Sequence, residues 1–257
     1  MNHFCTLFDS RYLSRGLALH QSLMAHATDW HLHILAFDDI CFQALSLLKL
    51  ENVSLIRLED FEDQTLREIK SDRSATEYCW TCTPSLLAYC LRHYVLPSCT
   101  YLDADLFFYA DPKQLLDEIP ATRSVLITDH RYTPKYDQSA LSGRYCVQFL
   151  TIKNDARGMQ VLESWRAACN AWCYNRQEDG KFGDQKYLDE WPQRFPEAIH
   201  ELRHFGGGVA PWNVQQYEFM ERGGQIHGEV EQTGEIFAVV FFHFHALRYM
   251  THDKIYL

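Results

Sequence analysis

The first 58 residues alternate between short β-prone apolar runs and segments with helical spacing, and this alternation is what most constrains the fold. We expect strands at 3–8, 31–37 and 53–58, separated by helices at 12–24 and 40–50. Such an order is typical of a parallel sheet with helices on both faces. Ligands bind beyond the carboxyl ends of the strands in these sheets, so the segment from Thr6 to Tyr12 is a candidate nucleotide site.

The rest of the chain continues the same pattern with more irregular connections. An apolar segment ends near Tyr94, and Pro84 should mark the first turn of a helix over 85–93. Pro192 should limit a short helix that starts near Gly183, and the alternation of His31 and His33 with apolar residues favours a half-exposed edge strand. Further strands are expected at 100–103, 125–130, 145–152 and 236–245, and a long helix at 156–174.

The composition is that of an ordinary globular protein. Of 257 residues, 47% are hydrophobic and 23% charged, and the formal charge of −10 without a basic run argues against a nucleic-acid partner. No apolar run approaches the roughly 20 residues that span a bilayer, and the first residues lack the pattern of an export signal. We therefore expect a cytoplasmic protein whose nine cysteines are reduced, with Cys79 and Cys82 buried in a helix rather than binding zinc.

Two carboxylates lie two residues apart in the apolar, β-prone run 101–108. In an extended backbone Asp103 and Asp105 point the same way, so their oxygens can converge. Burial of two unpaired carboxylates is costly, and a divalent cation such as Mn²⁺ or Mg²⁺ would remove that cost. The alternative is that they cap the next helix or pair with a basic residue, but the neighbouring positions contain no Lys or Arg.

Three further segments carry polar groups that allow a functional or a structural interpretation. His243 and His245 fall on one face of the last expected strand, as metal ligands or as core histidines. Asp184 is a candidate for catalysis or a helix cap. Trp212 and Asn213 could bind an acceptor sugar or pack in the core, whereas the glycines at 206–208 lack the Lys-Ser/Thr of a phosphate loop.

These motifs, in this order, resemble a GT-A glycosyltransferase, and more narrowly the relatives of glycosyltransferase family eight, the glycogenin and lipopolysaccharide galactosyltransferase group. The resemblance spans about 4–249. It rests on the first strand and its loop, on Asp103-Ala104-Asp105 as the D-x-D motif, on Gly183-Asp184-Gln185, and on His243-Phe244-His245. It implies an α/β fold of the Rossmann-like GT-A type, with a mostly parallel sheet, helices on both faces and a C-terminal acceptor-side region.

The resemblance also implies residue roles. Asp103, Asp105 and His243 would hold Mn²⁺ or Mg²⁺, with His245 as the alternative histidine. Thr6, Asp9 and Tyr12 would contact the uridine and its ribose, and Asp103 would also lie near the donor ribose. Asp184 and Gln185 would lie at the donor sugar and its reacting carbon.

Two segments depart from the family pattern. Ala246-Leu247-Arg248-Tyr249 replaces the usual Gly, Lys, Pro and Trp, so Arg248 is the substitute candidate for the lysine that meets the diphosphate. Cys146-Val147-Gln148 replaces Asn-x-Gly, which changes the sugar and acceptor pocket.

The function expected from this resemblance is metal-dependent transfer of a sugar from a nucleotide-diphosphate sugar, taken to be a UDP-sugar, to a glycan, glycolipid or other hydroxyl acceptor with retention of configuration. An inverting enzyme would need a base, for which Asp129 or Glu218 could serve. One domain is expected, with a nucleotide-binding half at about 1–130 and an acceptor-side half at about 131–257. The rival hypotheses are a sugar-nucleotide nucleotidyltransferase and a non-catalytic module that binds sugar nucleotides or glycans.

Overall fold

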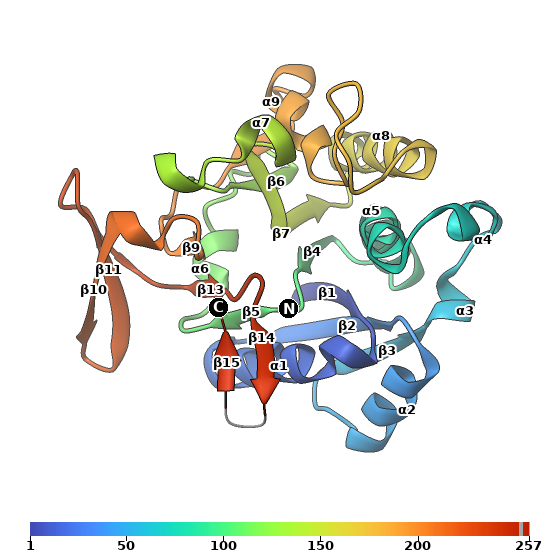
Figure 1. Ribbon diagram of the computed structural model, residues 1–257, viewed down its shortest axis with the longest axis horizontal. Coiled ribbons are helices and arrows are strands. Elements are labelled where there is room, and N and C mark those ends of the chain that lie inside the picture. Colours follow the sequence, from blue (N-terminus) through green and yellow to red (C-terminus); the bar gives the residue numbers. More distant parts are fainter. Residues whose placement is uncertain (252–253, 257) are drawn as a thin grey trace.

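The computed structural model describes residues 1–251 and 254–256, with side chains described as far as 248. Its largest sheet has seven strands in the order β3-β2-β1-β4-β7-β6-β8 (Figure 1). The strands are β1 (Asn2–Phe8), β2 (Trp30–Ala36), β3 (Val53–Arg57), β4 (Ser98–Leu102), β6 (Val125–Asp129), β7 (Tyr145–Lys153) and β8 (Ile199–Glu201).

The sheet is mostly parallel, as the strand and helix alternation predicted. Strand β1 pairs in parallel with β2 and with β4, and β2 pairs in parallel with β3. Strand β7 is the exception, because it runs antiparallel to both β4 and β6. The carboxyl ends of β1 and β4 therefore meet at one edge of the sheet, where the ligand site was expected.

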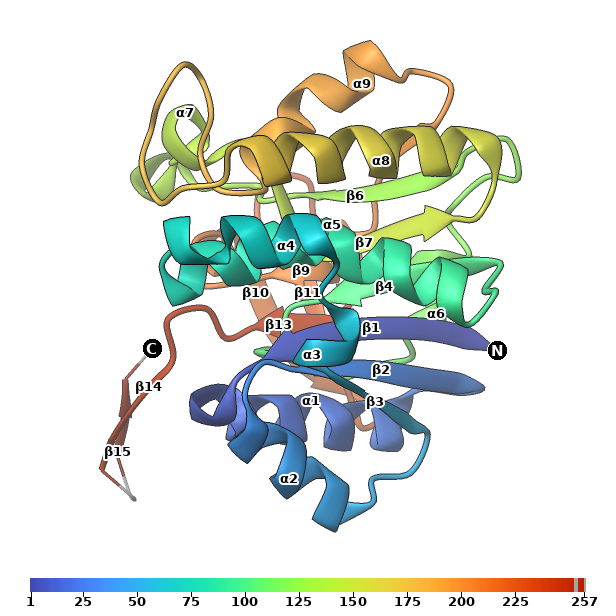
Figure 2. The same cartoon turned by 90° about the vertical axis from the view of Figure 1, so that its right-hand side faces the viewer.

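Helices cover both faces of this sheet (Figure 2). Helices α1 (Leu13–His26) and α2 (Asp39–Leu48) share a core with Phe4 and Phe8 of β1. Helices α5 (Ala75–His93) and α8 (Ala156–Ala171) pack on the other face, with Cys5 and Leu7 of β1. Alternate residues of one strand thus belong to different cores, as the two-residue period of a strand requires.

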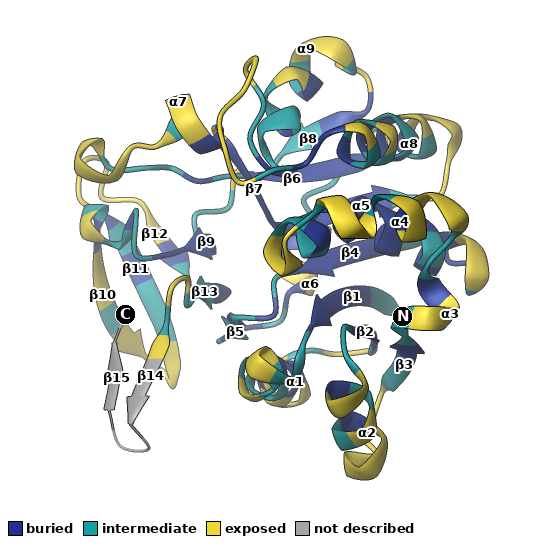
Figure 3. Ribbon diagram, turned by 45° about the vertical axis from the view of Figure 1, so that its right-hand side comes forward, coloured by how far each residue is buried: buried dark blue, intermediate teal, exposed yellow. Residues whose placement is uncertain are grey.

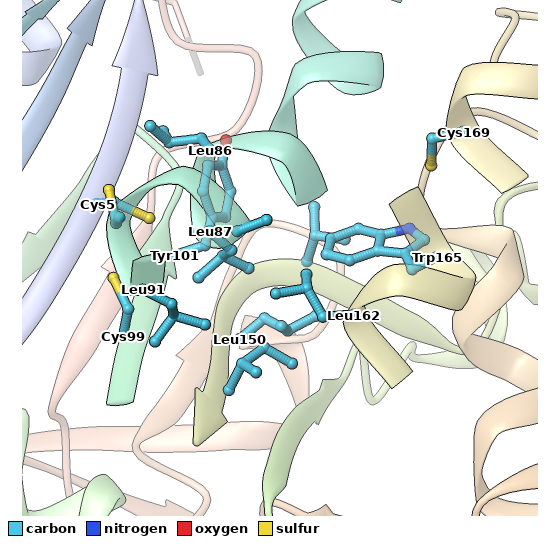
Figure 4. Close-up of a cluster of buried hydrophobic side chains, with 14 of the residues drawn as sticks. Cys5, Leu86, Leu87, Leu91, Cys99, Tyr101, Leu150, Leu162, Trp165 and Cys169 are labelled. Atoms are coloured by element: carbon cyan, nitrogen blue, oxygen red, sulfur yellow. The ribbon is translucent and has the colours of Figure 1, made fainter. Parts of the chain in front are cut away.

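Central strands are buried on both sides, whereas α2 and the outer turns are exposed (Figure 3). In the core beneath α5 and α8, Cys5 and Cys99 lie near Leu91, and Leu150 and Leu162 lie toward Trp165 (Figure 4). All nine cysteines are free and only Cys79 is not fully buried.

Helix α5 corrects the expectation that Pro84 begins a helix. It starts after Ser74, whose side chain forms a capping box with Glu77, and continues to His93 with Pro84 in its interior. An interior proline costs about 3 kcal/mol because one helical hydrogen bond is lost. Eleven buried residues of α5, Pro84 among them, pack between the sheet and α8, and this burial offsets the local penalty.

The last expected strand, 236–245, is two short strands in different sheets. Strand β12 (Ile236–Ala238) pairs with β11 (Gln225–Val230), whereas β13 (Phe241–His243) pairs with β5 (Leu106–Phe108) and β9 (Gly207–Val209). A Cβ on Gly206 would lie 1.8 Å from the Ala238 carbonyl oxygen, so the close approach of backbone at this crossing requires glycine. His243 therefore ends a strand and His245 lies beyond it.

Two smaller expectations were also wrong. Strand β2 is internal, not an edge, and its His33 is buried with its ring stacked on Tyr94 at 4.2 Å between centroids. Pro192 does not end a helix, because it lies at the start of α9 (Trp191–Arg194), where a missing N–H costs nothing.

The remaining elements connect these strands and helices or belong to two small antiparallel sheets, β10-β11-β12 and β14-β15. They are η1 (Ser10–Tyr12), α3 (Leu58–Phe61), α4 (Gln64–Ile69), η2 (Lys70–Asp72), α6 (Lys113–Leu116), η3 (Pro134–Tyr136), α7 (Ser139–Ser142), η4 (Lys186–Glu190), η5 (Val214–Gln216), β10 (Tyr217–Arg222), β14 (Arg248–Thr251) and β15 (Lys254–Tyr256). None of the helices in the described ranges has the length and apolarity that a bilayer crossing demands.

Candidate active site

The three predicted metal ligands meet at the carboxyl end of β4. Asp103-Ala104-Asp105 forms the turn from β4 into β5, and β5 pairs with β13 so that Leu106 lies opposite His243. This register places His243 Nε2 at 3.1 Å from Asp105 Oδ1 and 3.7 Å from Asp103 Oδ2. His243, which comes from a distant part of the chain, thus lies with Nε2 near an oxygen of each aspartate.

The orientation of His243 is set by Gln148 of β7. His243 Nδ1 lies 2.7 Å from Gln148 Oε1, an acceptor, so Nδ1 carries the hydrogen and Nε2 faces the aspartates. The Gln148 carbonyl oxygen also accepts a hydrogen bond from Asp103 N at 3.0 Å. A single residue of β7 therefore positions both the histidine and the first aspartate.

The charges of Asp103, Asp105 and His243 shift one another's pKa values. Burial raises the pKa of Asp103 to about 7, although nearby His243 opposes the shift. Burial would also raise the pKa of Asp105, but the charge of His243 and its hydrogen bond outweigh burial and lower it. The same ion pair with Asp105 overcomes the desolvation of His243 and raises its pKa well above the usual value. The charge of His243 thus favours the ionised form of both Asp103 and Asp105.

Asp184 adds a third carboxyl group to the same cavity. Its backbone oxygen accepts a hydrogen bond from Trp165 Nε1 at 2.8 Å, which fixes the segment against α8. Its side chain is 3% exposed and its Oδ2 has no hydrogen-bond partner. Burial and the neighbouring charge of Asp103 raise the pKa of Asp184 well above its ordinary range. Gln185 donates from Nε2 to the Ser142 carbonyl oxygen at 2.9 Å.

Asp103, Asp184, Gln185 and His243 line a cavity of about 560 Å³, and Asp105 lies outside its lining. Its wall is rich in aromatic rings and, among the residues that line it, has no Lys or Arg. The aromatic residues of the wall are Trp80, Tyr101, Tyr132, Tyr136, Phe182 and Trp212. This volume lies within the range of small-molecule sites.

The predicted nucleotide loop lies after β1. Asp9 accepts hydrogen bonds from the backbone N of Arg11 and of Tyr12, and so holds the turn η1. Burial, and then the charge of Asp105, raise the pKa of Tyr12. Thr6 is fully buried and its hydroxyl has no hydrogen-bond partner. The roles of these three residues toward a nucleotide stay predictions.

Arg15 of α1 joins this loop to the late histidine segment, a connection the sequence did not indicate. Its guanidinium lies over the Tyr12 ring at 4.3 Å and donates to the Leu247 carbonyl oxygen. Arg248, the predicted diphosphate contact, is exposed at the start of β14.

His245 and Trp212 border the site beyond β13. Their rings are 5.4 Å apart in an edge contact, and Trp212 makes a similar contact with His243 at 5.3 Å. Asn213, by contrast, is buried and donates to the His130 and Gly208 carbonyl oxygens, so its role is structural. Trp212 and Asn213 are adjacent in the sequence, but only Trp212 borders the cavity.

Neither residue considered as an inverting base lines the cavity. Asp129 Oδ2 binds Arg144 Nε at 2.7 Å and its Oδ1 accepts from Arg131 N. Glu218 is exposed on strand β10.

The sequence indicated no role for His130, and it related Cys146 and Gln148 to the sugar and acceptor pocket but not to the metal ligands. Burial raises the pKa of the Cys146 thiol, but the charges of His130 and His243 and hydrogen bonding to them outweigh burial and lower the pKa to about 6. Asp103, Cys146 and His243 each offer a ligand atom, and these atoms lie within 4.8 Å of one another. The sequence feature that could have indicated a shared site is the two-residue spacing of Cys146 and Gln148, because residues i and i+2 of a strand lie on one face of the sheet.

The residues present fit a divalent cation. Two carboxylates and an imidazole nitrogen converge, the imidazole is fixed through its other nitrogen, and Asp184 Oδ2 is a buried oxygen without a partner. Oxygen and nitrogen donors of this kind suit Mn²⁺ and its neighbours, and a hydrogen bond to the remote nitrogen is usual for a metal-binding histidine.

Comparisons with known proteins show the family of the chain and its fold. YfnF of Bacillus subtilis (strain 168), an uncharacterized protein, is 31% identical over 259 residues that cover 98% of this chain and 84% of YfnF. The chain belongs to the family of YfnF. The uncharacterized YfnD of the same organism is 28% identical and covers 98% of this chain and 80% of YfnD. No protein-family model matches the sequence.

The YfnF family member described here has the GT-A fold of known glycosyltransferases. Mouse xyloside xylosyltransferase 1 superposes with a TM-score of 0.60 at 13% identity, covering 95% of this chain and 98% of that one. The galactosyltransferase LgtC, solved with donor and acceptor sugar analogues, superposes with a TM-score of 0.59 at 14% identity, covering 95% and 87%. The expected fold class is thereby confirmed.

Proposed function

We propose that this protein is a metal-dependent glycosyltransferase that moves a sugar from a nucleotide-diphosphate sugar, a UDP-sugar in the first instance, to a hydroxyl of a glycan or glycolipid. The observation that carries the proposal is the convergence of Asp103, Asp105 and His243 beside a cavity at the carboxyl end of β4. Strands β1 and β4 end at this same edge, which suits a nucleotide on one side and a sugar on the other.

Asp103, Asp105 and His243 would hold the cation, with Mn²⁺ or Mg²⁺ as the candidates. A bound divalent cation supplies Lewis-acid stabilisation of the charge that develops on the leaving diphosphate. Tyr12 and Asp9 would hold the nucleoside, and the exposed Arg248 is the candidate cation for the diphosphate. Asp184 and Gln185 lie in the cavity wall as the groups nearest the donor sugar in our proposal.

Retention of configuration is part of the proposal. Asp129 and Glu218, the residues considered for an inverting mechanism, do not line the cavity. Asp184, the buried carboxyl group that does line it, is raised in pKa by burial and by the charge of Asp103. The acceptor would enter over the aromatic wall, where sugar faces stack well.

The test is release of nucleoside diphosphate in the presence of Mn²⁺ with a panel of sugar nucleotides. We expect release with at least one UDP-sugar, and Asp105→Ala should reduce it by at least about 100-fold, or 2.7 kcal/mol of transition-state stabilisation. Asp60→Ala, which removes an exposed carboxylate of α3, is the matched control and should retain full activity.

The other outcomes identify the rival functions. Pyrophosphate production would indicate a nucleotidyltransferase, and donor binding without any nucleotide release would indicate a binding module. Full activity of Asp105→Ala would contradict the metal assignment. The anomeric configuration of the product, read by NMR, tests retention separately.

A further inference from the structure

Cys146 places a sulfur atom inside the group of metal ligands. It lies on β7, buried at 4% exposure, and pairs with Thr128 of β6 across the sheet. Its Sγ, one Asp103 carboxylate oxygen and one His243 ring nitrogen all lie within 4.8 Å of one another. This separation is close enough for all three atoms to contact one cation after small adjustments.

The rings of His243 and His130 are each held in orientation by a hydrogen bond at Nδ1. His243 Nδ1 is held by Gln148 Oε1 at 2.7 Å, and His130 Nδ1 lies 3.0 Å from the Arg144 carbonyl oxygen. Because a carbonyl can only accept, each Nδ1 carries a hydrogen and each Nε2 is directed elsewhere. Both rings interact electrostatically with the thiol. A ring nitrogen of His243 thus lies within 4.8 Å of the sulfur, and its Nε2 faces the two carboxylates.

We propose that Cys146 is a ligand of the bound cation and that its thiolate directs the site toward thiophilic divalent cations such as Zn²⁺, Co²⁺ and Fe²⁺ rather than Mg²⁺. This inference rests on the proposed function, because it requires a metal site at Asp103, Asp105 and His243. Sulfur ligands favour borderline and soft cations, whereas Mg²⁺ prefers oxygen alone. A ligand set that includes the Cys146 sulfur therefore has a different cation preference from a set of two carboxylates and an imidazole.

The alternative is that Cys146 is a buried thiol that merely pairs with His130. A hydrogen-bonded cysteine of this kind would leave the choice of metal to the carboxylates and His243. The two cases differ in whether a sulfur-to-metal bond forms, and that bond has its own absorption.

The experiment is a titration of chelator-treated protein with Co²⁺, followed by ultraviolet and visible absorption. We expect a near-ultraviolet sulfur-to-cobalt charge-transfer band for the wild type, and its loss in Cys146→Ser. The affinity for Co²⁺ and Zn²⁺ should fall by at least about tenfold in Cys146→Ser, while the affinity for Mg²⁺ changes much less. Thermal melting of the metal-free proteins checks that the variant is folded.

Two control variants assign the band to one sulfur. Cys79→Ser changes a cysteine of α5 that is outside the ligand group, and it should keep the band. Cys5, Cys90 and Cys99 form another buried group with three sulfurs within 4.8 Å, so Cys90→Ala tests whether they contribute. A band that persists in Cys146→Ser and disappears in Cys90→Ala would overturn the proposal.

The failure of this inference is distinguishable from failure of the proposed function. Suppose that the wild type and Cys146→Ser bind Co²⁺ with equal affinity, that neither shows a charge-transfer band, and that Asp105→Asn does not bind Co²⁺. This result would remove Cys146 from the ligand set and leave the metal site in place. No binding of any divalent cation by the wild type would overturn both.

Discussion

His243 Nε2 and Asp105 Oδ1 are 3.1 Å apart although one residue lies near the middle of the chain and the other near its end. The pairing of β13 with β5 brings them together, because His243 lies opposite Leu106 in the register. The site is therefore assembled by a small three-stranded sheet, β5-β13-β9, and not by the large sheet alone. The predictions below depend on this arrangement.

The two late histidines should differ in their effect on metal binding. His243 is buried and faces the aspartates, whereas His245 lies beyond β13 with its ring against Trp212. We expect His243→Ala to lower Mn²⁺ affinity by at least about tenfold, and His245→Ala to change it by less than about threefold. Isothermal titration calorimetry with Mn²⁺ measures both. The reverse order of effects would make His245 the ligand.

Gln148 should matter through His243 and not through substrate contact. Gln148→Met keeps the size of the side chain but removes the acceptor of His243 Nδ1, leaving a buried donor unpaired at a cost of about 1–3 kcal/mol. Metal affinity should fall about 10- to 100-fold, the usual effect of losing the partner of a metal-binding histidine. Equilibrium dialysis with Mn²⁺ measures the affinity. Gln160→Met, at an exposed position of α8, is the control and should bind Mn²⁺ with wild-type affinity. Wild-type Mn²⁺ affinity in Gln148→Met would contradict the positioning role of Gln148.

The metal-free protein should lose stability as the pH rises toward 8, through Asp103. Its folded pKa of about 7 lies above the ordinary value of 3.8, so the protonated carboxyl group favours the folded state. This contribution is complete below pH 3.8 and is lost as the pH rises through 7. Between pH 5 and pH 8 the wild type should lose on the order of 2 kcal/mol more than Asp103→Asn, which cannot titrate.

Urea unfolding in the presence of a chelator measures that difference. Adding Mn²⁺ at pH 8 should restore stability in the wild type, because a ligand that binds only the folded state stabilises it. It should do so much less in Asp103→Asn. Parallel pH profiles for the two chelated proteins would show that Asp103 has an ordinary pKa.

Local patterns were enough to predict the framework of the fold. The alternation that predicted a mostly parallel sheet is confirmed in β1, β2 and β3, because two-residue and helical periods reflect which faces are buried. Pro84 was misread because propensity describes an isolated segment, whereas α5 is stabilised by packing along its whole length. The last strand was misread because the sequence does not reveal that the chain passes from one sheet to another at Ala238 and Val240.

Within the site, the sequence by itself determined the two aspartates. The apolar run before them ends as β4, and this places Asp103 and Asp105 just beyond its carboxyl end, although they lie in the turn into β5 and not in the extended strand that their spacing predicted. Only the tertiary structure decided which other atoms join them, because strand register and sheet closure bring together residues that no spacing relates. It placed His243 against Asp105, Gln148 behind the imidazole, and the Cys146 sulfur beside both.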